Sequence, residues 1–150
     1  MSPTTLVTGG TGFLGRHLVP ALCRAGHTVR VLTRNPSAHP WLNRYPQVES
    51  FAADILDAQR VAEAVSGCTY VVHAAGKFRF WGKPEAFERT NVGGTESILS
   101  AVANSPVKKL IFISTVAVVG TPDPARVVDE HHPVHPADGY QQSKLHAEQA

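Results

Sequence analysis

The chain of 150 residues is 43% hydrophobic and 17% charged, which are values of a single globular domain and exclude a disordered chain. Its formal net charge is only +2 and it has no basic run, so the composition gives no sign of a nucleic-acid partner. The longest apolar stretch, 110–119, is interrupted by Ser114 and Thr115 and is too short to span a bilayer, so we expect a soluble protein without a membrane partner.

A glycine-rich turn follows the first predicted strand, which ends at Thr8, and precedes a predicted helix over 16–25. Glycines at this spacing allow a sharp turn, close approach of a pyrophosphate and tight packing of the helix on the sheet. The free N–H groups at the start of the helix would face the phosphate charge. A strand–turn–helix unit of this kind can also be purely structural. The candidate phosphate-binding residues are Gly9, Gly12, Phe13, Leu14 and Gly15.

The second predicted strand contains Val29, Val31 and Leu32 and ends at Thr33 and Arg34. Dinucleotide sites often carry an acidic residue here, about 20 residues after the glycines, which binds the adenosine ribose. This chain has a guanidinium instead, and a guanidinium suits the 2′-phosphate of NADP. We therefore expect NADP to be preferred over NAD, although a solvated surface arginine would look the same in the sequence.

A third strand is predicted over 48–52 and a helix over 58–65, with Asp57 as its N-cap. Asp54 lies between them, directly after the strand. Its carboxylate could accept a hydrogen bond from the amino group of an adenine. The alternative is that Asp54 is only a turn residue.

The fourth predicted strand, 70–76, is nearly all apolar, as expected for a parallel strand covered on both faces. The small residues Ala74, Ala75 and Gly76 at its end leave room for a ligand to lie across it. The loop 77–82 that follows is aromatic and basic. It either lines a pocket for an apolar or ring-shaped substrate or packs as a lid on the core, and the sequence favours neither.

A long helix is predicted over 84–103, starting near a proline. Its inward face, by spacings of three and four, includes Asn91. A polar group on that face must find a hydrogen-bond partner. Asn91 is therefore either a core asparagine whose hydrogen bonds are satisfied or part of a site.

The fifth predicted strand, 110–113, is followed by Ser114 and Thr115. After a proline-rich loop, Asp138 and Gln141 have the spacing of a capping box that starts a last helix. That helix carries Tyr140 and Lys144, which are four residues apart and share one face.

These side chains suit proton transfer to a substrate oxygen. A phenol is a poor base at neutral pH, but a neighbouring ammonium group and a helix N-terminus both favour the phenolate. Tyr140 could then exchange a proton with a hydroxyl or carbonyl while a hydride passes to or from a nicotinamide. The hydroxyl of Thr115 would hold the same oxygen.

The remaining groups that bind metals in other proteins give no metal motif. His131, His132 and His135 fall in the proline-rich loop without ligand spacing, so we expect no metal site. Cys23 and Cys68 belong to no motif and indicate the reduced thiols of a cytoplasmic protein.

Five strands that alternate with helices predict an α/β fold of the Rossmann type. Right-handed crossovers give a doubly wound parallel sheet in the order 3-2-1-4-5. The candidate residues fall at the carboxyl ends of strands or on the adjoining helices, where such sheets bind ligands.

In its motifs the chain resembles the extended short-chain dehydrogenase/reductase family, in particular its NAD-dependent epimerase/dehydratase and dihydroflavonol-reductase-like group. The matching segments occur in the family's order over nearly the whole chain. They are 8–15, 53–57, 73–76, 91–95, 113–115 and 140–144.

The resemblance implies transfer of a hydride between NAD(P) and a secondary alcohol or ketone, in a sugar-derived or other ring-containing small molecule. It implies that the glycines hold pyrophosphate, that Asp54 and Ile55 hold adenine, and that Lys144 also contacts the nicotinamide ribose. The catalytic candidates are Thr115, Tyr140, Lys144 and Asn91. The cofactor-binding candidates are Gly9, Gly12, Phe13, Leu14, Gly15, Arg34, Asp54, Ile55, Ala74, Ala75, Gly76, Tyr140 and Lys144.

The chain departs from the family pattern in three places. Thr115 replaces the commoner serine and keeps the hydroxyl. Val119 stands where sugar epimerases often have a tyrosine, which weakens a nucleotide-sugar interpretation. The sequence ends at Ala150, before the family's sixth strand and substrate-binding portion. We therefore expect 1–150 to be an incomplete NAD(P)-binding domain, inactive alone, with a homodimer as one option for the full-length form.

A rival hypothesis is a non-catalytic dinucleotide-sensing module. Such a module would need the glycines but would not need Tyr140 and Lys144. The presence of both, together with Thr115, favours the enzyme.

Overall fold

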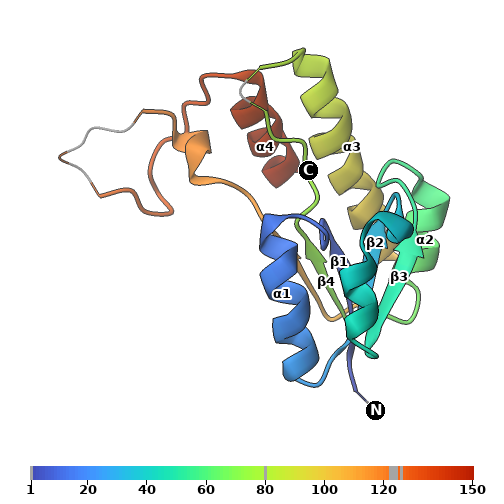
Figure 1. The fold of residues 1–150 in the computed structure, drawn as a ribbon. Coiled ribbons are helices and arrows are strands. Elements are labelled where there is room, and N and C mark those ends of the chain that lie inside the picture. Colours follow the sequence, from blue (N-terminus) through green and yellow to red (C-terminus); the bar gives the residue numbers. More distant parts are fainter. Residues whose placement is uncertain (1, 80, 122–124, 126) are drawn as a thin grey trace.

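A computed structural model describes residues 2–79, 81–121, 125 and 127–150, and within them a five-stranded parallel sheet in the order β3-β2-β1-β4-β5 (Figure 1). This confirms the predicted α/β fold and strand order. The strands are β1 (Thr4–Thr8), β2 (Thr28–Thr33), β3 (Val48–Ala52), β4 (Tyr70–His73) and β5 (Lys109–Phe112). The α-helices are α1 (Phe13–Arg24), α2 (Ala58–Val65), α3 (Pro84–Ala103) and α4 (Gly139–Gln149). The 3₁₀-helices are η1 (Pro36–Ala38), η2 (Pro40–Arg44) and η3 (Val116–Val119).

Four features differ from the sequence prediction, of which the smallest is the shift of β5 by one residue, to Lys109–Phe112. Helix α1 begins at Phe13 rather than at residue 16, because Gly12 already serves as its N-cap. Strand β4 ends at His73, so the small residues after it lie outside the sheet. The polar segment expected to be a plain loop contains η1 and η2, and Leu42 of η2 is buried in the core.

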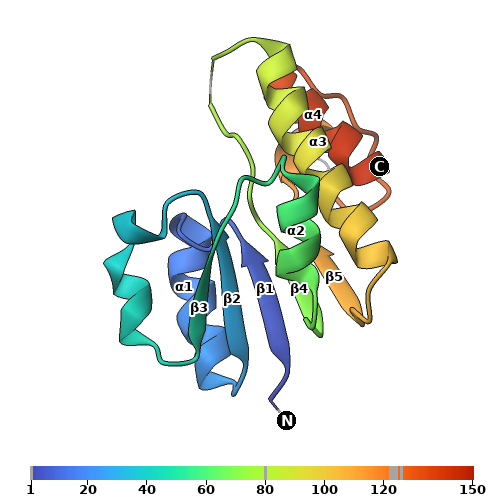
Figure 2. The ribbon, with the colours of Figure 1, turned by 90° about the vertical axis from the view of Figure 1, so that its right-hand side faces the viewer.

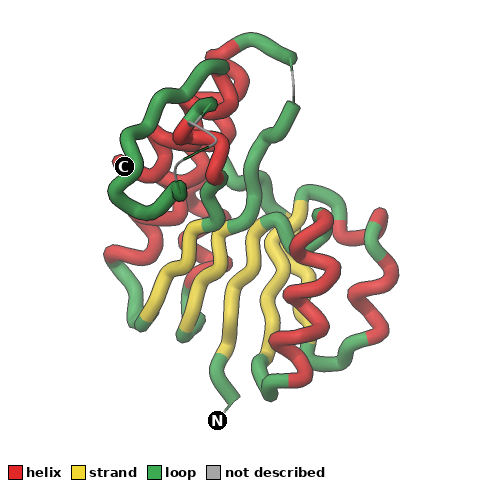
Figure 3. The backbone as a smooth tube through the Cα atoms, turned by 90° about the vertical axis from the view of Figure 1, so that its left-hand side faces the viewer, coloured by secondary structure: helices red, strands yellow, loops and turns green. Residues whose placement is uncertain are grey.

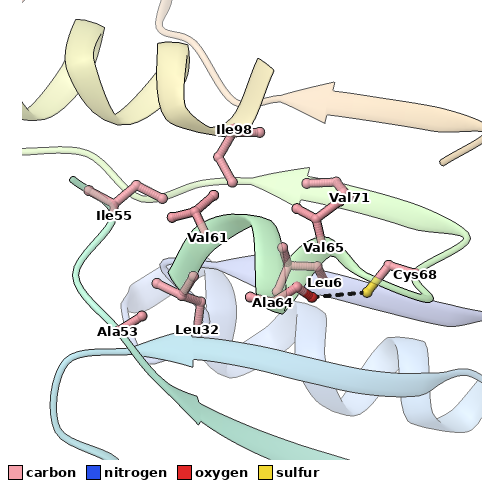
Figure 4. Close-up of a cluster of buried hydrophobic side chains, with 10 residues drawn as sticks. All are labelled: Leu6, Leu32, Ala53, Ile55, Val61, Ala64, Val65, Cys68, Val71 and Ile98. Atoms are coloured by element: carbon pink, nitrogen blue, oxygen red, sulfur yellow. Dashed lines mark hydrogen bonds between the residues drawn. The ribbon is translucent and has the colours of Figure 1, made fainter. Parts of the chain in front are cut away.

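Apolar residues alternate between the two faces of the sheet. Leu6, Leu32 and Val71 face α2 and α3, where Val61 and Ile98 are fully buried (Figure 4). Their sequence neighbours on the same strands face α1 and η2. Figures 2 and 3 show the resulting three layers, with the sheet between the helices of its two sides. Both faces are covered, which explains the nearly continuous apolar runs of the central strands.

Helix α2 is capped at both ends by side chains. The Asp57 carboxylate accepts a hydrogen bond from the Arg60 amide at 3.1 Å, as the sequence predicted. At the other end, Arg30 of β2 donates to the carbonyl oxygens of Ala64 and Ser66, both at 2.8 Å. Arg30 therefore satisfies acceptors that a helix C-terminus leaves unpaired.

Helix α4 packs along α3, as Figures 1 and 2 show from two directions. Ser143, Lys144 and Ala147 form its buried face. The Asp138 carboxylate caps the helix through the Gln141 amide at 2.8 Å, as predicted. The Gln141 side chain accepts from the Ala137 amide rather than from the amide of Asp138, so the capping box is displaced by one residue. Among the described residues, no helix has the length and apolar character to cross a membrane.

Candidate active site

The glycines of the turn after β1 have different structural roles. Gly9 has φ +69°, and a Cβ there would lie 2.6 Å from the carbonyl carbon and oxygen of Ala74. A Cβ at Gly15 would lie 2.3 Å from the carbonyl of Gly10. A Cβ at Gly12 would meet only the Gly9 oxygen, at 3.3 Å. The fold therefore requires glycine at 9 and 15, whereas Gly12 has no comparable packing reason to be glycine.

The N-terminus of α1 offers unpaired amide groups. Its N-cap, Gly12, provides no capping side chain, and the first turn holds no acidic residue. The first intrahelical bond runs from the Arg16 amide to the Gly12 carbonyl, so the three amides before it have no partner inside the helix. The Phe13 side chain is 88% exposed, so it does not cover this end. These are the features of an anion-binding helix N-terminus.

A cleft of ≈ 910 Å³ runs along the carboxyl ends of β1, β2 and β4. It brings together predicted residues from four separate segments of the chain. Those that line it are Gly9, Gly12, Arg34, Asp54, Ile55, Ala74, Ala75 and Gly76. The predicted residues Phe13, Leu14 and Gly15 belong to the adjoining first turn of α1, and Asn91, Thr115, Tyr140 and Lys144 lie outside the lining of this cleft.

Charge in the cleft is mainly positive. Its charged lining residues are Arg34, Lys77, Arg79 and Arg89, against the single carboxylate of Asp54. Arg34 is exposed and directly follows the end of β2. A lining of this sign suits a ligand that carries several phosphate charges.

Asp54 and Ile55 begin the turn after β3. The Asp54 carboxylate accepts from the Leu56 amide at 2.9 Å, so it does have the turn role that the sequence left open, while its side chain remains exposed in the cleft. Ile55 is buried, and a Cβ at Gly94 would lie 3.0 Å from its side chain. The glycine in α3 thus permits close approach of this helix to the turn, which offsets its low helix propensity.

Asn91 is 2% exposed and holds two other segments in place. Its side-chain oxygen, Oδ1, accepts from the Lys77 backbone amide at 2.7 Å. Its side-chain nitrogen, Nδ2, donates to the Lys77 backbone carbonyl at 3.2 Å and to the Ser143 hydroxyl at 2.8 Å. The Ser143 hydroxyl in turn donates to the Tyr140 carbonyl at 2.7 Å. Asn91 therefore does more than satisfy its own polar groups, because it connects the segment after β4 with α4.

Lys144 is only 5% exposed and points to the end of β5. Its ammonium group donates to the Ile113 carbonyl at 2.7 Å and lies 4.1 Å from the ring centroid of Phe112. Burial lowers the pKa of Lys144 to about 8, although the carboxylate of Glu148 acts in the opposite direction. Thr115, two residues after Ile113, caps η3 by accepting from the Ala117 amide at 3.2 Å.

Tyr140 packs among aromatic rings. Its ring centroid lies 4.9 Å from that of Phe78 and 6.3 Å from that of Phe87, in edge-on arrangements. Phe78 is nevertheless 56% exposed and Trp81 is 74% exposed, so neither is buried as part of a lid over the core. Phe80, in the same aromatic loop, lies outside the described residues.

The structure adds four polar residues that the sequence analysis did not select as site residues. Thr8, His73, Thr95 and Ser143 are all buried and hydrogen-bonded to one another or to predicted site residues. Burial, followed by the charge of Lys144, lowers the pKa of His73 to about 4. All four stand within or beside the motifs that carry the family resemblance, which is the signal that could have identified them.

The fold is that of a Rossmann-type α/β protein, with a positively charged cleft at the carboxyl ends of its strands. Residues 5–150 match the sequence model of the NAD dependent epimerase/dehydratase family. The chain belongs to this family, and its resemblance to the extended short-chain dehydrogenases/reductases is confirmed.

Three similar proteins illustrate the range of the family. A 4-hydroxy-2-methyl-3-oxo-4-farnesyl-3,4-dihydroquinoline-1-oxide ketoreductase of Stigmatella aurantiaca is 34% identical over 97% of this chain and 44% of its own. A 3 beta-hydroxysteroid dehydrogenase/Delta 5→4-isomerase of Mycobacterium tuberculosis is 37% identical over 76% of this chain and 32% of its own. The dTDP-glucose 4,6-dehydratase DesIV of Streptomyces venezuelae, solved with NAD, is 28% identical with a TM-score of 0.88, over 97% of this chain and 49% of its own. The chain thus spans less than half the length of these relatives.

Proposed function

We propose that this chain forms the NAD(P)-binding part of an oxidoreductase or epimerase-type enzyme that transfers a hydride between a nicotinamide and a secondary alcohol or ketone. The observation that carries the proposal is the placement of Lys144. Lys144 and Tyr140 are on the same helix, α4. The buried ammonium group of Lys144 donates to the carbonyl of Ile113, which directly follows β5 and lies two residues before Thr115. A cation is costly to bury, and chemistry at this place gives a reason for the cost.

The residues present fit a dinucleotide. Gly9, Gly12 and the first turn of α1, with Phe13, Leu14 and Gly15, would hold the pyrophosphate on unpaired amides. Asp54 and Ile55 would hold the adenine, and the small residues 74–76 would leave space for the cofactor along the cleft. Tyr140 and Lys144 would contact the nicotinamide ribose. When bound, the nicotinamide supplies or accepts the hydride.

The chain's own side chains would manage the proton. Tyr140 would exchange its phenolic proton with the substrate oxygen. Lys144, one turn further along the same helix, would supply positive charge to stabilise negative charge that develops on the phenolic oxygen. Thr115 accepts a backbone hydrogen bond, which leaves its hydroxyl hydrogen for the same substrate oxygen.

We further propose a preference for NADP over NAD. Arg34 lies exposed at the cleft after β2, and the residue before it, Thr33, carries no carboxylate to bind the ribose hydroxyls. The positive lining of the cleft supports the additional phosphate as well.

For the substrate we propose an apolar or ring-containing ketone or alcohol. Phe78 and Phe87 surround Tyr140 with aromatic surface, and Phe78 is partly exposed there. The relatives named above act, by their names, on a farnesylated quinoline oxide and on a steroid. Val119 in place of a tyrosine favours such substrates over a nucleotide sugar. The buried free thiols of Cys23 and Cys68 support the cytoplasm as the location.

A single substitution tests the chemistry. In a catalytically active form of the protein, Tyr140→Phe should lower hydride transfer by a factor on the order of 10² to 10⁴ while NAD(P)H binding, measured by titration calorimetry, stays within a few-fold of the wild type. Turnover is followed by NAD(P)H absorbance with a panel of ring-containing ketones. Tyr45→Phe is the matched control, because Tyr45 is a half-buried tyrosine that packs on Trp41, outside the cleft lining. Wild-type turnover by Tyr140→Phe would remove Tyr140 from the catalytic role. A wild-type protein that binds NAD(P)H but turns over no member of the panel would favour the sensing module instead.

A further inference from the structure

We propose that His73 is a positioning residue of this site. Its neutral imidazole, with the hydrogen on Nε2, is the centre of a series of hydrogen bonds. The series joins the backbone amide of Ala75, in the cleft, to the backbone carbonyl of Asn91, on α3. The consequence for dinucleotide binding rests on the proposed function. The chain of hydrogen bonds itself does not.

His73 is the last residue of β4, which lies between β1 and β5, and it is 1% exposed. In the parallel pairing of β1 with β4 it stands opposite Thr8. The Thr8 hydroxyl lies 2.6 Å from Nδ1 of the ring, and the Thr95 hydroxyl of α3 lies 3.1 Å from Nε2. Both ring nitrogens therefore have one partner each, from opposite sides.

Counting hydrogens assigns the direction of each bond. Each threonine hydroxyl has a single hydrogen to donate. The Thr95 hydroxyl donates to the Asn91 carbonyl at 2.6 Å, so Nε2 must be the donor in its contact with Thr95. In the neutral ring Nδ1 then carries no hydrogen, and the Thr8 hydroxyl donates to it. The Thr8 oxygen also accepts from the Ala75 amide at 3.1 Å, so every hydrogen in the chain has an acceptor.

The opposite tautomer fits these contacts poorly. A hydrogen on Nδ1 would point at the Thr8 oxygen, which already accepts from Ala75, and the hydroxyl hydrogen of Thr8 would have no acceptor among the described contacts. Nε2 would then draw the Thr95 hydrogen away from the Asn91 carbonyl. A buried polar hydrogen without an acceptor is costly, so the Nε2–H form is favoured.

A charged ring is excluded for similar reasons. An imidazolium would donate from both nitrogens, which creates the same conflict at Thr8. The charged group that faces His73 is Lys144, and the ring of Phe112 lies 5.5 Å away between centroids. Burial and the Lys144 charge lower the pKa of His73 to about 4, in agreement with a neutral ring at physiological pH.

Both ends of the chain lie at working parts of the site. Ala75 lines the cleft, and Asn91 holds the Lys77 backbone and Ser143. One ring in the core therefore fixes the floor of the cofactor cleft relative to the helix that supports α4. Residues that do not touch a bound ligand can in this way hold in place the residues that do.

The tautomer can be measured without any ligand. Long-range ¹H–¹⁵N NMR of the chain labelled at histidine distinguishes the two neutral tautomers and the imidazolium, and a His73→Gln sample identifies the His73 signals. We expect the neutral Nε2–H form from pH 7 down to pH 5. The Nδ1–H tautomer, or conversion to imidazolium above pH 5, would overturn the proposal.

A matched set of variants tests the positioning role. Thr95→Val removes the acceptor for the Nε2 hydrogen of His73, whereas Thr95→Ser keeps it. Ile98→Val removes a methyl group from the same buried face of α3 and leaves every group in the hydrogen-bond series unchanged. We expect Thr95→Val to speed exchange of the Ala75 amide and to weaken NAD(P)H binding about three- to tenfold, with Thr95→Ser within about twofold of wild type.

Equal effects of Thr95→Val, Thr95→Ser and Ile98→Val on Ala75 exchange would refute the role of His73. If the wild-type chain binds no dinucleotide, the proposed function fails, and the tautomer and the Ala75 exchange rates still decide on His73. If Thr95→Val does not fold, the tautomer measured in the wild type decides alone.

Discussion

The side-chain amide of Asn91 and the hydroxyl of Ser143 lie 2.8 Å apart and join α3 to α4 deep inside the protein. The Ser143 hydroxyl in turn donates to the backbone carbonyl of Tyr140 at 2.7 Å, one turn earlier in α4. The backbone of the proposed catalytic tyrosine is thus positioned from α3, through two buried side chains. Asn91 also holds both backbone polar groups of Lys77, so one amide side chain fixes the segment after β4 and the helix of Tyr140 together.

The first prediction concerns this link. Ser143→Ala should lower the free energy of unfolding by about 1–3 kcal/mol, because it leaves a buried amide hydrogen of Asn91 without its acceptor. Amide exchange in α4 should become faster as well. Ser97→Ala is the control, since that hydroxyl donates only to the Gly93 carbonyl within its own helix. Equal losses in the two variants, measured by denaturant unfolding, would contradict a special role for Ser143.

The second prediction concerns cofactor choice. Arg34→Ala should weaken NADP binding about 10- to 100-fold, the effect of losing a charge-assisted hydrogen bond, and should leave NAD binding nearly unchanged. Arg44→Ala, at an exposed arginine of η2, is the control and should alter neither affinity. Titration calorimetry with both cofactors measures the difference. An equal loss for NAD and NADP would show that Arg34 does not read the 2′-phosphate.

The third prediction separates the roles of the glycines. Gly15→Ala should unfold or strongly destabilise the chain, because its Cβ would lie 2.3 Å from the Gly10 backbone. Gly12→Ala should remain folded, since its Cβ meets only one oxygen at 3.3 Å, but should weaken dinucleotide binding by a factor on the order of ten, because a methyl group then faces the cleft. Circular dichroism melting and titration calorimetry test the two halves. A Gly12→Ala chain with wild-type affinity would remove Gly12 from the phosphate site.

Much of this arrangement follows from local sequence. The alternation of apolar strands with helices predicts a doubly wound parallel sheet, and together with the glycine turn after the first strand it led to the correct strand order. The caps at Asp57 and Asp138 were predictable because they depend on residues three positions away.

What escaped prediction depends on contacts across the sheet. Thr8 and His73 are 65 residues apart and meet only through the register of β1 and β4, which a sequence pattern does not reveal. The contact of Lys144 with the Ile113 carbonyl is likewise a consequence of how α4 docks. The end of β4 at His73 was missed because small apolar residues after it continue the strand-like composition.

The fourth prediction concerns Lys144 and pH. Burial lowers the pKa of Lys144 from 10.5 to about 8, so between these pH values the unfolded chain binds more protons than the folded chain. The free energy of unfolding therefore rises with pH across this window through Lys144, by about 3 kcal/mol at most. Below pH 8 the buried charge reduces stability, and above pH 10.5 that cost is gone.

Lys144→Met should remove this rise and make the ligand-free chain more stable at pH 7. Denaturant unfolding at pH 7 and pH 10 gives the free energy of unfolding of each protein at both pH values. Subtracting the wild-type values from those of the variant removes the contribution of tyrosines and thiols, which titrate in both proteins. Lys109→Met, at an exposed lysine of β5, should change neither value by more than about 0.5 kcal/mol. A Lys144→Met chain with the wild-type pH dependence would show that the ammonium group is not desolvated. A chain that gains stability while an active form loses turnover would show instead that the buried charge is retained for chemistry at the cost of stability.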